Sequence, residues 1–269
     1  KVGHIIGSQM FTGALFLWVI ALFKRKAWQH FSWKTTSQLL LAGSLSGLTG
    51  MLYYGSMQTL PASIAIVLLF QFAWIGSLYD WIFKRQKPGK SMYISLAVIV
   101  IGTLLAANVF AGGFEGFTVW GLILGLLSAF TFAGFIYVSG HVATQVTPWL
   151  RSPLMVTGAA LIAFIIFPPS FFISDVLAAG LWKYTLLLAF FGAVVPTVFF
   201  TLGAPHLKGG VATILGSVEL PVAVVMAWLV LKESVNVLQW LGVLLILLAI
   251  AVGELYPPKP KTKPQSQSR

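Results

Sequence analysis

Long apolar stretches, each close to the length of one membrane-spanning helix, occur along almost the whole chain. A helix crosses a hydrocarbon core of about 30 Å with roughly 20 apolar residues. Nine stretches reach this length, and short breaks of Pro, Gly or charged residues separate them. We therefore expect transmembrane helices near residues 3–23, 37–58, 61–83, 91–108, 118–140, 152–173, 183–204, 209–231 and 235–256.

These stretches are apolar on every side, whereas the strands of a membrane barrel alternate in character over about ten residues. The pattern thus predicts an all-α fold, a polytopic membrane helical bundle. Composition agrees, because 58% of the residues are hydrophobic, 9% are charged and the mean hydropathy is +0.91. That balance excludes a soluble globular domain. The chain also has no cysteine, which excludes disulfides and thiol chemistry.

The basic residues lie on alternate loops of this arrangement. Of the 17 Lys and Arg, 14 follow the first, third, fifth, seventh or ninth stretch, and Arg151 is the one that follows the fifth. Under the positive-inside rule these loops are cytoplasmic. We expect a multi-pass protein of the cell membrane with a cytoplasmic carboxyl terminus. The net charge of +11 is then a feature of topology and not of nucleic-acid binding.

Two parts of the chain match when one is shifted by 148 residues, which superposes residues 60–85 on 208–233. The matched stretches are the third and the eighth. A separation of five helices, an odd number, predicts two repeats of opposite orientation, as in many secondary transporters. We expect an incomplete first repeat at 1–108, with one further helix before it, a complete second repeat at 118–256, and a basic cytoplasmic tail at 257–269.

Several segments resemble the EamA-type transporters of the drug/metabolite transporter superfamily. They are the small-residue starts LPASIAIVLL and KGGVATILGS, VELPVAVVMAWLVLKES (218–234) and WLGVLLILLAIAVGE (240–254). The resemblance implies ten helices around a central cavity and export or import of small organic solutes, often amino acids or related metabolites. In that family an acidic residue closes the fourth helix of each repeat. Glu233 matches it in the second repeat, whereas KRQKPGK (84–90) has no acid.

One carboxylate, Glu219, lies near the middle of an otherwise apolar stretch, ILGSVELPVAVVMAW (214–228). A charged side chain at that depth costs at least about 2.5–3.5 kcal/mol on insertion scales. A functional explanation is a cavity-lining carboxylate that binds and releases a proton and so couples solute movement to a proton gradient. The structural alternative is a neutral or paired side chain that caps backbone groups freed by Pro221, which has no amide hydrogen.

The same 148-residue shift places Gln71 at the position of Glu219, so both side chains would face one central site. A lone Gln can instead form an interhelical hydrogen bond. Trp74 follows Gln71 by one turn on the same helical face, and Tyr53 and Tyr54 lie near the end of the second stretch. These five residues are the predicted cavity lining, although Trp and Tyr also mark membrane interfaces.

Four Pro and Gly residues are candidate helix breaks. Pro61 begins the third stretch, Gly209 and Gly210 begin the eighth, and Pro221 lies inside the eighth. Such residues permit the bending that one repeat needs to rock against the other. Plain turns are the alternative for the first three.

The sequence contains no metal-binding spacing, no nucleotide-binding loop and no nucleophile elbow. We therefore expect no cofactor, no metal and no enzymatic activity. The favoured interpretation is a secondary active transporter that exports small organic metabolites, such as amino acids or drugs, by alternating access. Its expected partners are a small-molecule solute and the lipid bilayer, with no nucleic acid. The alternative is a non-transporting membrane protein, either a scaffold subunit or a membrane-embedded enzyme.

Overall fold

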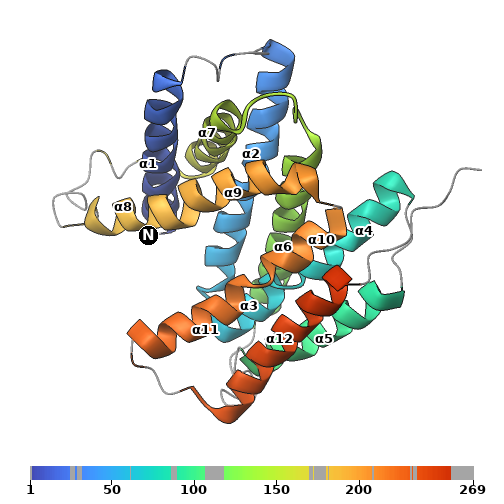
Figure 1. The fold of residues 1–269 in the computed structure, drawn as a ribbon. Coiled ribbons are helices and arrows are strands. Elements are labelled where there is room, and N and C mark those ends of the chain that lie inside the picture. Colours follow the sequence, from blue (N-terminus) through green and yellow to red (C-terminus); the bar gives the residue numbers. More distant parts are fainter. Residues whose placement is uncertain are drawn as a thin grey trace, which may run out of the picture.

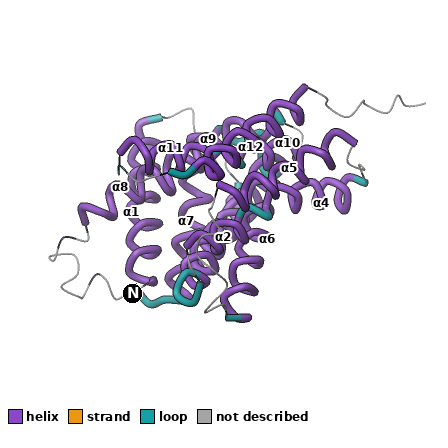
Figure 2. The backbone as a smooth tube through the Cα atoms, turned by 90° about the horizontal axis from the view of Figure 1, so that it is seen from below, coloured by secondary structure: helices purple, strands orange, loops and turns teal. Residues whose placement is uncertain are grey.

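The part of the chain that the computed structural model describes is built almost entirely from helices (Figures 1 and 2). It describes residues 2–24, 28, 32–60, 62–85, 90–106, 118–169, 172, 180, 182–207, 209–230, 232 and 235–255. Within these ranges the backbone forms no strand. The predicted tail at 257–269 lies outside the described residues.

The helices follow the order of the predicted stretches. In the first part of the chain they are α1 (Val2–Phe23), α2 (Trp33–Ser56), α3 (Ala62–Leu69), α4 (Phe72–Lys84) and α5 (Lys90–Ala106). In the second part they are α6 (Val119–His141), α7 (Pro148–Ile166), α8 (Trp182–Ala189), η5 (Phe190–Val194), α9 (Val195–Gly203), η6 (Ala204–His206), α10 (Gly209–Gly216), α11 (Glu219–Val230) and α12 (Val237–Leu255).

Helices cover most of the described residues of every predicted stretch, so the all-α prediction is confirmed. Within the described ranges, six segments are long and apolar enough to cross a membrane, and α5 and α12 contain shorter apolar helices. The remaining helix, α2, has 24 residues but includes many Ser, Thr and Gly. The predicted boundaries at 152–173 are wrong, because the helix already begins at Pro148. Proline is accepted there since first-turn amides have no partner within the helix.

α2 and α7 pack so closely that only glycine fits where they cross. A Cβ atom added to Gly43 of α2 would overlap the backbone of Met155 in α7, and one added to Gly158 of α7 would overlap the backbone of Leu40. In lipid, small residues promote helix association because they let backbones approach and make extensive van der Waals contact. Figure 1 shows α1, α2 and α7 together in one part of the molecule, and α1 also packs against α7.

A second close pair is formed by α5 and α12, which lie side by side in Figure 1. A Cβ atom added to Gly102 of α5 would lie 2.9 Å from the carbonyl oxygen of Gly242 in α12. The reciprocal addition at Gly242 would overlap the backbone of Ala106. At both crossings, α2 with α7 and α5 with α12, glycine therefore allows helices that are far apart in the sequence to pack backbone against backbone.

Arg151 does not lie in a cytoplasmic loop, as the sequence had suggested, but is fully buried near the start of α7. Its guanidinium donates hydrogen bonds to the carbonyl oxygens of Ser139 and Val142 at the end of α6, and of Thr201 in α9. Carbonyl groups at helix C-termini carry partial negative charge. They stabilise the buried cation, which thereby links α6, α7 and α9.

Candidate functional site

Two helical segments are interrupted at corresponding positions. α3 ends at Leu69 and α4 begins at Phe72, whereas α10 ends at Gly216 and α11 begins at Glu219. Gln71 is the N-cap of α4, and Glu219 is the first residue of α11. Each of the two polar residues that the 148-residue shift aligns therefore stands where a half-helix begins. All four half-helices are labelled in Figure 1.

The interruption at Gln71 is made by its own side chain. Its Nε2 donates a hydrogen bond of 2.9 Å to the carbonyl oxygen of Val67, which is the acceptor that the Gln71 backbone amide would use in a continuous α-helix. That amide instead bonds to the carbonyl oxygen of Leu68 at 3.2 Å, in a tighter turn. A side chain inserted into the backbone ladder is a known cause of helix distortion.

The interruption before Glu219 has a different cause. Pro221 is the third residue of α11, where its missing amide hydrogen costs nothing because first-turn amides have no helical acceptor. In a continuous helix its ring would clash with the carbonyl group of Ser217, four residues earlier. The amides of Ser217 and Val218 accordingly form tighter bonds of 3.0 and 3.1 Å to carbonyl oxygens three residues back.

The other predicted breaks do not coincide with these interruptions. Gly209 and Gly210 are the first two residues of α10, so they begin a helix and the interruption follows several residues later. Pro61 lies outside the described residues. Of the predicted break residues whose backbone is described, Pro221 is the one that lies beside an interruption.

Glu219 is exposed, whereas Pro221, two residues later, is buried. The carboxylate is close enough to the phenol of Tyr53 for an electrostatic interaction. The rings of Tyr53 and Tyr54, both partly buried near the end of α2, are 5.7 Å apart. Within the described part of the chain the carboxylate has no hydrogen bond and no ion pair, so it does not cap backbone freed by Pro221. The helix dipole of α11 favours a negative charge at this position.

Gln71 contacts Trp74, the residue predicted to share its helical face. The indole Nε1 of Trp74 donates a hydrogen bond of 3.0 Å to Oε1 of Gln71, which holds the Gln71 amide in the orientation that interrupts the helix. The structure thus brings the predicted cavity residues together in two groups. One group is Gln71 with Trp74, and the other is Glu219 with Tyr53 and Tyr54.

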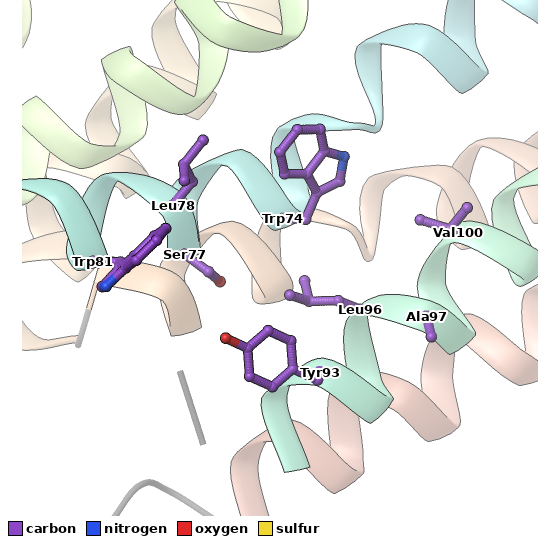
Figure 3. Close-up of a pocket in the computed structure, with 8 residues that line it drawn as sticks. All are labelled: Trp74, Ser77, Leu78, Trp81, Tyr93, Leu96, Ala97 and Val100. Atoms are coloured by element: carbon purple, nitrogen blue, oxygen red, sulfur yellow. The ribbon is translucent and has the colours of Figure 1, made fainter. Parts of the chain in front are cut away.

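Trp74 also lines a pocket between α4 and α5, with a volume of about 370 Å³ (Figure 3). The hydroxyl groups of Ser77 on α4 and Tyr93 on α5 point toward one another across it (Figure 3). Sequence reasoning missed both residues. One Ser among many in apolar helices carries no signal of its own, and Tyr93 lies where interfacial tyrosines are common.

Other buried polar side chains join helices. The hydroxyl groups of Ser8 in α1 and Thr185 in α8 are 3.0 Å apart, and the amide of Gln9 donates to the carbonyl oxygen of Leu188 at 3.1 Å. Such bonds satisfy polar groups that have no access to water in a bilayer. Among the described residues, no three His, Asp or Glu side chains lie close enough to hold a metal ion.

Gln71→Leu is expected to destabilise the protein by about 1–3 kcal/mol, because two side-chain hydrogen bonds are lost and each contributes about 0.5–1.5 kcal/mol. The losses are the bonds to Val67 and Trp74. Unfolding in mixed detergent micelles measures the change. Gln58→Leu, at an exposed position after α2, is the matched control and should have no effect. Equal stability of the two variants would show that the Gln71 bonds contribute nothing.

Comparisons with known proteins cover almost the whole chain. The sequence pattern of the EamA-like transporter family covers residues 2–108 and 119–252. An uncharacterized transporter of Synechocystis sp. is 24% identical over 265 aligned residues, which cover 91% of this chain and 79% of that protein. A solved crystal structure of a protein has the same fold, with a TM-score of 0.75 at 16% identity over 95% of this chain and 88% of the other. The chain therefore belongs to the EamA-like transporter family and is a multi-pass membrane transporter.

Proposed function

We propose that the protein is a secondary active transporter that exports a small organic metabolite, such as an amino acid or a drug, across the cell membrane. Residues 1–108 and 118–256 are two inverted repeats that alternate between access to the two sides. The carboxyl terminus is cytoplasmic, in line with the positive-inside rule. Solute binds between the repeats, at the depth where α4 and α11 begin.

The observation that carries this proposal is the exposed carboxylate of Glu219 at the start of an interrupted helix. A charge exposed to hydrocarbon costs at least about 2.5–3.5 kcal/mol, and a water-filled cavity removes that cost. Interrupted helices whose ends face a midplane site are typical of solute and ion sites in secondary transporters. A scaffold subunit needs neither a wet cavity nor a carboxylate at this depth.

The surroundings of the two interruptions suit a zwitterionic solute. The amino-terminal ends of α4 and α11 carry partial positive charge, which favours a solute carboxylate. The carboxylate of Glu219 favours a solute ammonium group, and the rings of Tyr53 and Tyr54 provide apolar walls. Amino acids and related metabolites combine these features.

Glu219 also supports coupling to protons. In a narrow cavity a carboxylate can exchange a proton for a cationic or zwitterionic solute, since both compete for the same negative charge. A proton that enters on one side and leaves on the other then drives the solute in the opposite direction. Proton-coupled export follows from this competition.

Glu219→Gln tests the proposal, because it keeps the shape of the side chain and removes the titratable group. The full-length protein is reconstituted in liposomes, and uptake driven by a proton gradient is measured for amino acids, nucleosides and cationic drugs. We expect the wild type to accumulate one class and the Gln variant to lose the dependence on the gradient. Glu219→Asp, which keeps a carboxylate, should retain it.

Two results would contradict the proposal. If Glu219→Gln transports with an unchanged response to the gradient, Glu219 is not the coupling group. If the wild-type protein is folded in the liposomes but moves none of these solutes, the prediction that it transports these solute classes is wrong.

A further inference from the structure

We propose that the groove between α4 and α5 binds one anionic phospholipid, with an acyl chain in the pocket and the headgroup at the basic ends of the two helices. This inference rests on the membrane location of the chain and not on the proposed transport mechanism. Figure 3 shows the groove with its lining side chains.

The walls of the groove are suited to a hydrocarbon chain. The groove has a volume of about 370 Å³. Most of the side chains that line it are apolar and come from both helices, among them Leu78 and Trp81 on α4 and Leu96 and Val100 on α5. Trp81 and Tyr93 remain about half exposed. In a bilayer, lipid is the molecule present at high concentration beside such a surface, so an acyl chain is the occupant that the location favours.

Ser77 provides the reason to expect a ligand with a polar group. Its side chain is 3% exposed, and within the described part of the chain its hydroxyl has no hydrogen-bond partner. A serine in a helix commonly bonds to a carbonyl oxygen of the preceding turn, but this hydroxyl points into the groove toward that of Tyr93 (Figure 3). An ester carbonyl of a phospholipid accepts hydrogen bonds, so it is a suitable acceptor for these two donors.

The charge at one end of the groove selects an anionic headgroup. Beyond Trp81, α4 ends at Lys84 and is capped by the exposed Arg85. α5 begins at Lys90, three residues before Tyr93. Basic residues next to a transmembrane helix attract anionic lipids by about 1 kcal/mol each in general. The two helices that form the groove therefore both have a basic residue at the end nearest Trp81 and Tyr93.

The test is native mass spectrometry of the purified, delipidated protein during titration with phosphatidylglycerol or with phosphatidylcholine of the same acyl chains. We expect one phosphatidylglycerol to bind about tenfold more tightly than phosphatidylcholine. Ala97→Trp places an indole in the groove and should abolish that binding. Ile101→Trp, on the exposed part of the same helix, is the matched control and should leave it unchanged. Arg85→Gln should remove the preference for phosphatidylglycerol.

Equal binding of the two lipids by the wild type would overturn the proposal, and so would equal effects of Ala97→Trp and Ile101→Trp. Glycerol phosphate, which has a phosphate but no acyl chain, should not compete with the lipid. Effective competition by glycerol phosphate would show a simple phosphate site and would also contradict the proposal. Transport is not measured, so failure of the proposed function does not change any of these results.

Discussion

Replacing Gly43 by Ala is expected to destabilise the protein strongly, although it adds one methyl group. The new Cβ atom would overlap the backbone of Met155 in α7, and backbone cannot rotate away as a long side chain can. Overpacking costs about 1–3 kcal/mol where side chains can adjust. Here α2 and α7 must move apart along their contact, which is more costly than a change of rotamer. We therefore expect the free energy of unfolding to fall by about 3 kcal/mol or more, which is the upper end of the range for overpacking.

Unfolding in mixed detergent micelles measures this change, and the same helix provides a matched control. A Cβ atom added to Gly50, two turns further along α2, would approach no closer than 4.0 Å to Ile6. Ala is also a better helix former than Gly by about 1 kcal/mol. Gly50→Ala should therefore be neutral or stabilising. If Gly43→Ala and Gly50→Ala unfold alike, α2 and α7 do not cross as closely as described.

Arg151→Met is expected to cost about 3 kcal/mol or more, because each buried acceptor that loses its hydrogen-bond donor costs about 1–3 kcal/mol. The change leaves the carbonyl oxygens of Ser139, Val142 and Thr201 without the donor that now satisfies them. These groups lie at the junction of α6, α7 and α9, where the helices pack against one another. We expect a large fall in the yield of folded protein and in its free energy of unfolding.

Arg151→Lys distinguishes charge from geometry. An ammonium group keeps the positive charge and three donors but lacks the planar fork that reaches carbonyl groups on separate helices, so stability should recover only in part. Arg85→Gln removes an exposed arginine at the end of α4 and should leave the stability unchanged. Wild-type stability of Arg151→Met would mean that the buried guanidinium does not link these helices.

The positions of the helices could be predicted from the sequence because the bilayer imposes a simple rule. A chain that crosses hydrocarbon must satisfy its backbone within each helix, so length and apolarity are enough to locate most spans. The wrong boundary at the start of α7 shows a case that this rule does not predict. Arg151 was excluded from the predicted helix as a charged residue, whereas its burial depends on carbonyl groups at the ends of α6 and α9. A pattern along one segment does not contain partners on two others.

The candidate site was predicted in part. Glu219 was conspicuous as a lone charge in an apolar stretch, and Gln71 followed from the internal match. Trp74 was expected to share a helical face with Gln71, but the hydrogen bond of 3.0 Å between the two side chains was not predicted. The interruption at Gln71 was not foreseen, because it depends on the rotamer that brings Nε2 to the carbonyl oxygen of Val67. Whether these residues bind solute stays a prediction until Glu219→Gln is measured.

The sequence by itself determined the fold class, the approximate helix boundaries and the family, since these depend on hydrophobicity along the chain and on short local motifs. Only the tertiary structure decided which glycines permit close crossings, what holds Arg151, and that Ser77 points into a groove beside Tyr93. Each of these depends on atoms far apart in the sequence. Their approach results from packing of whole helices, which local composition does not specify.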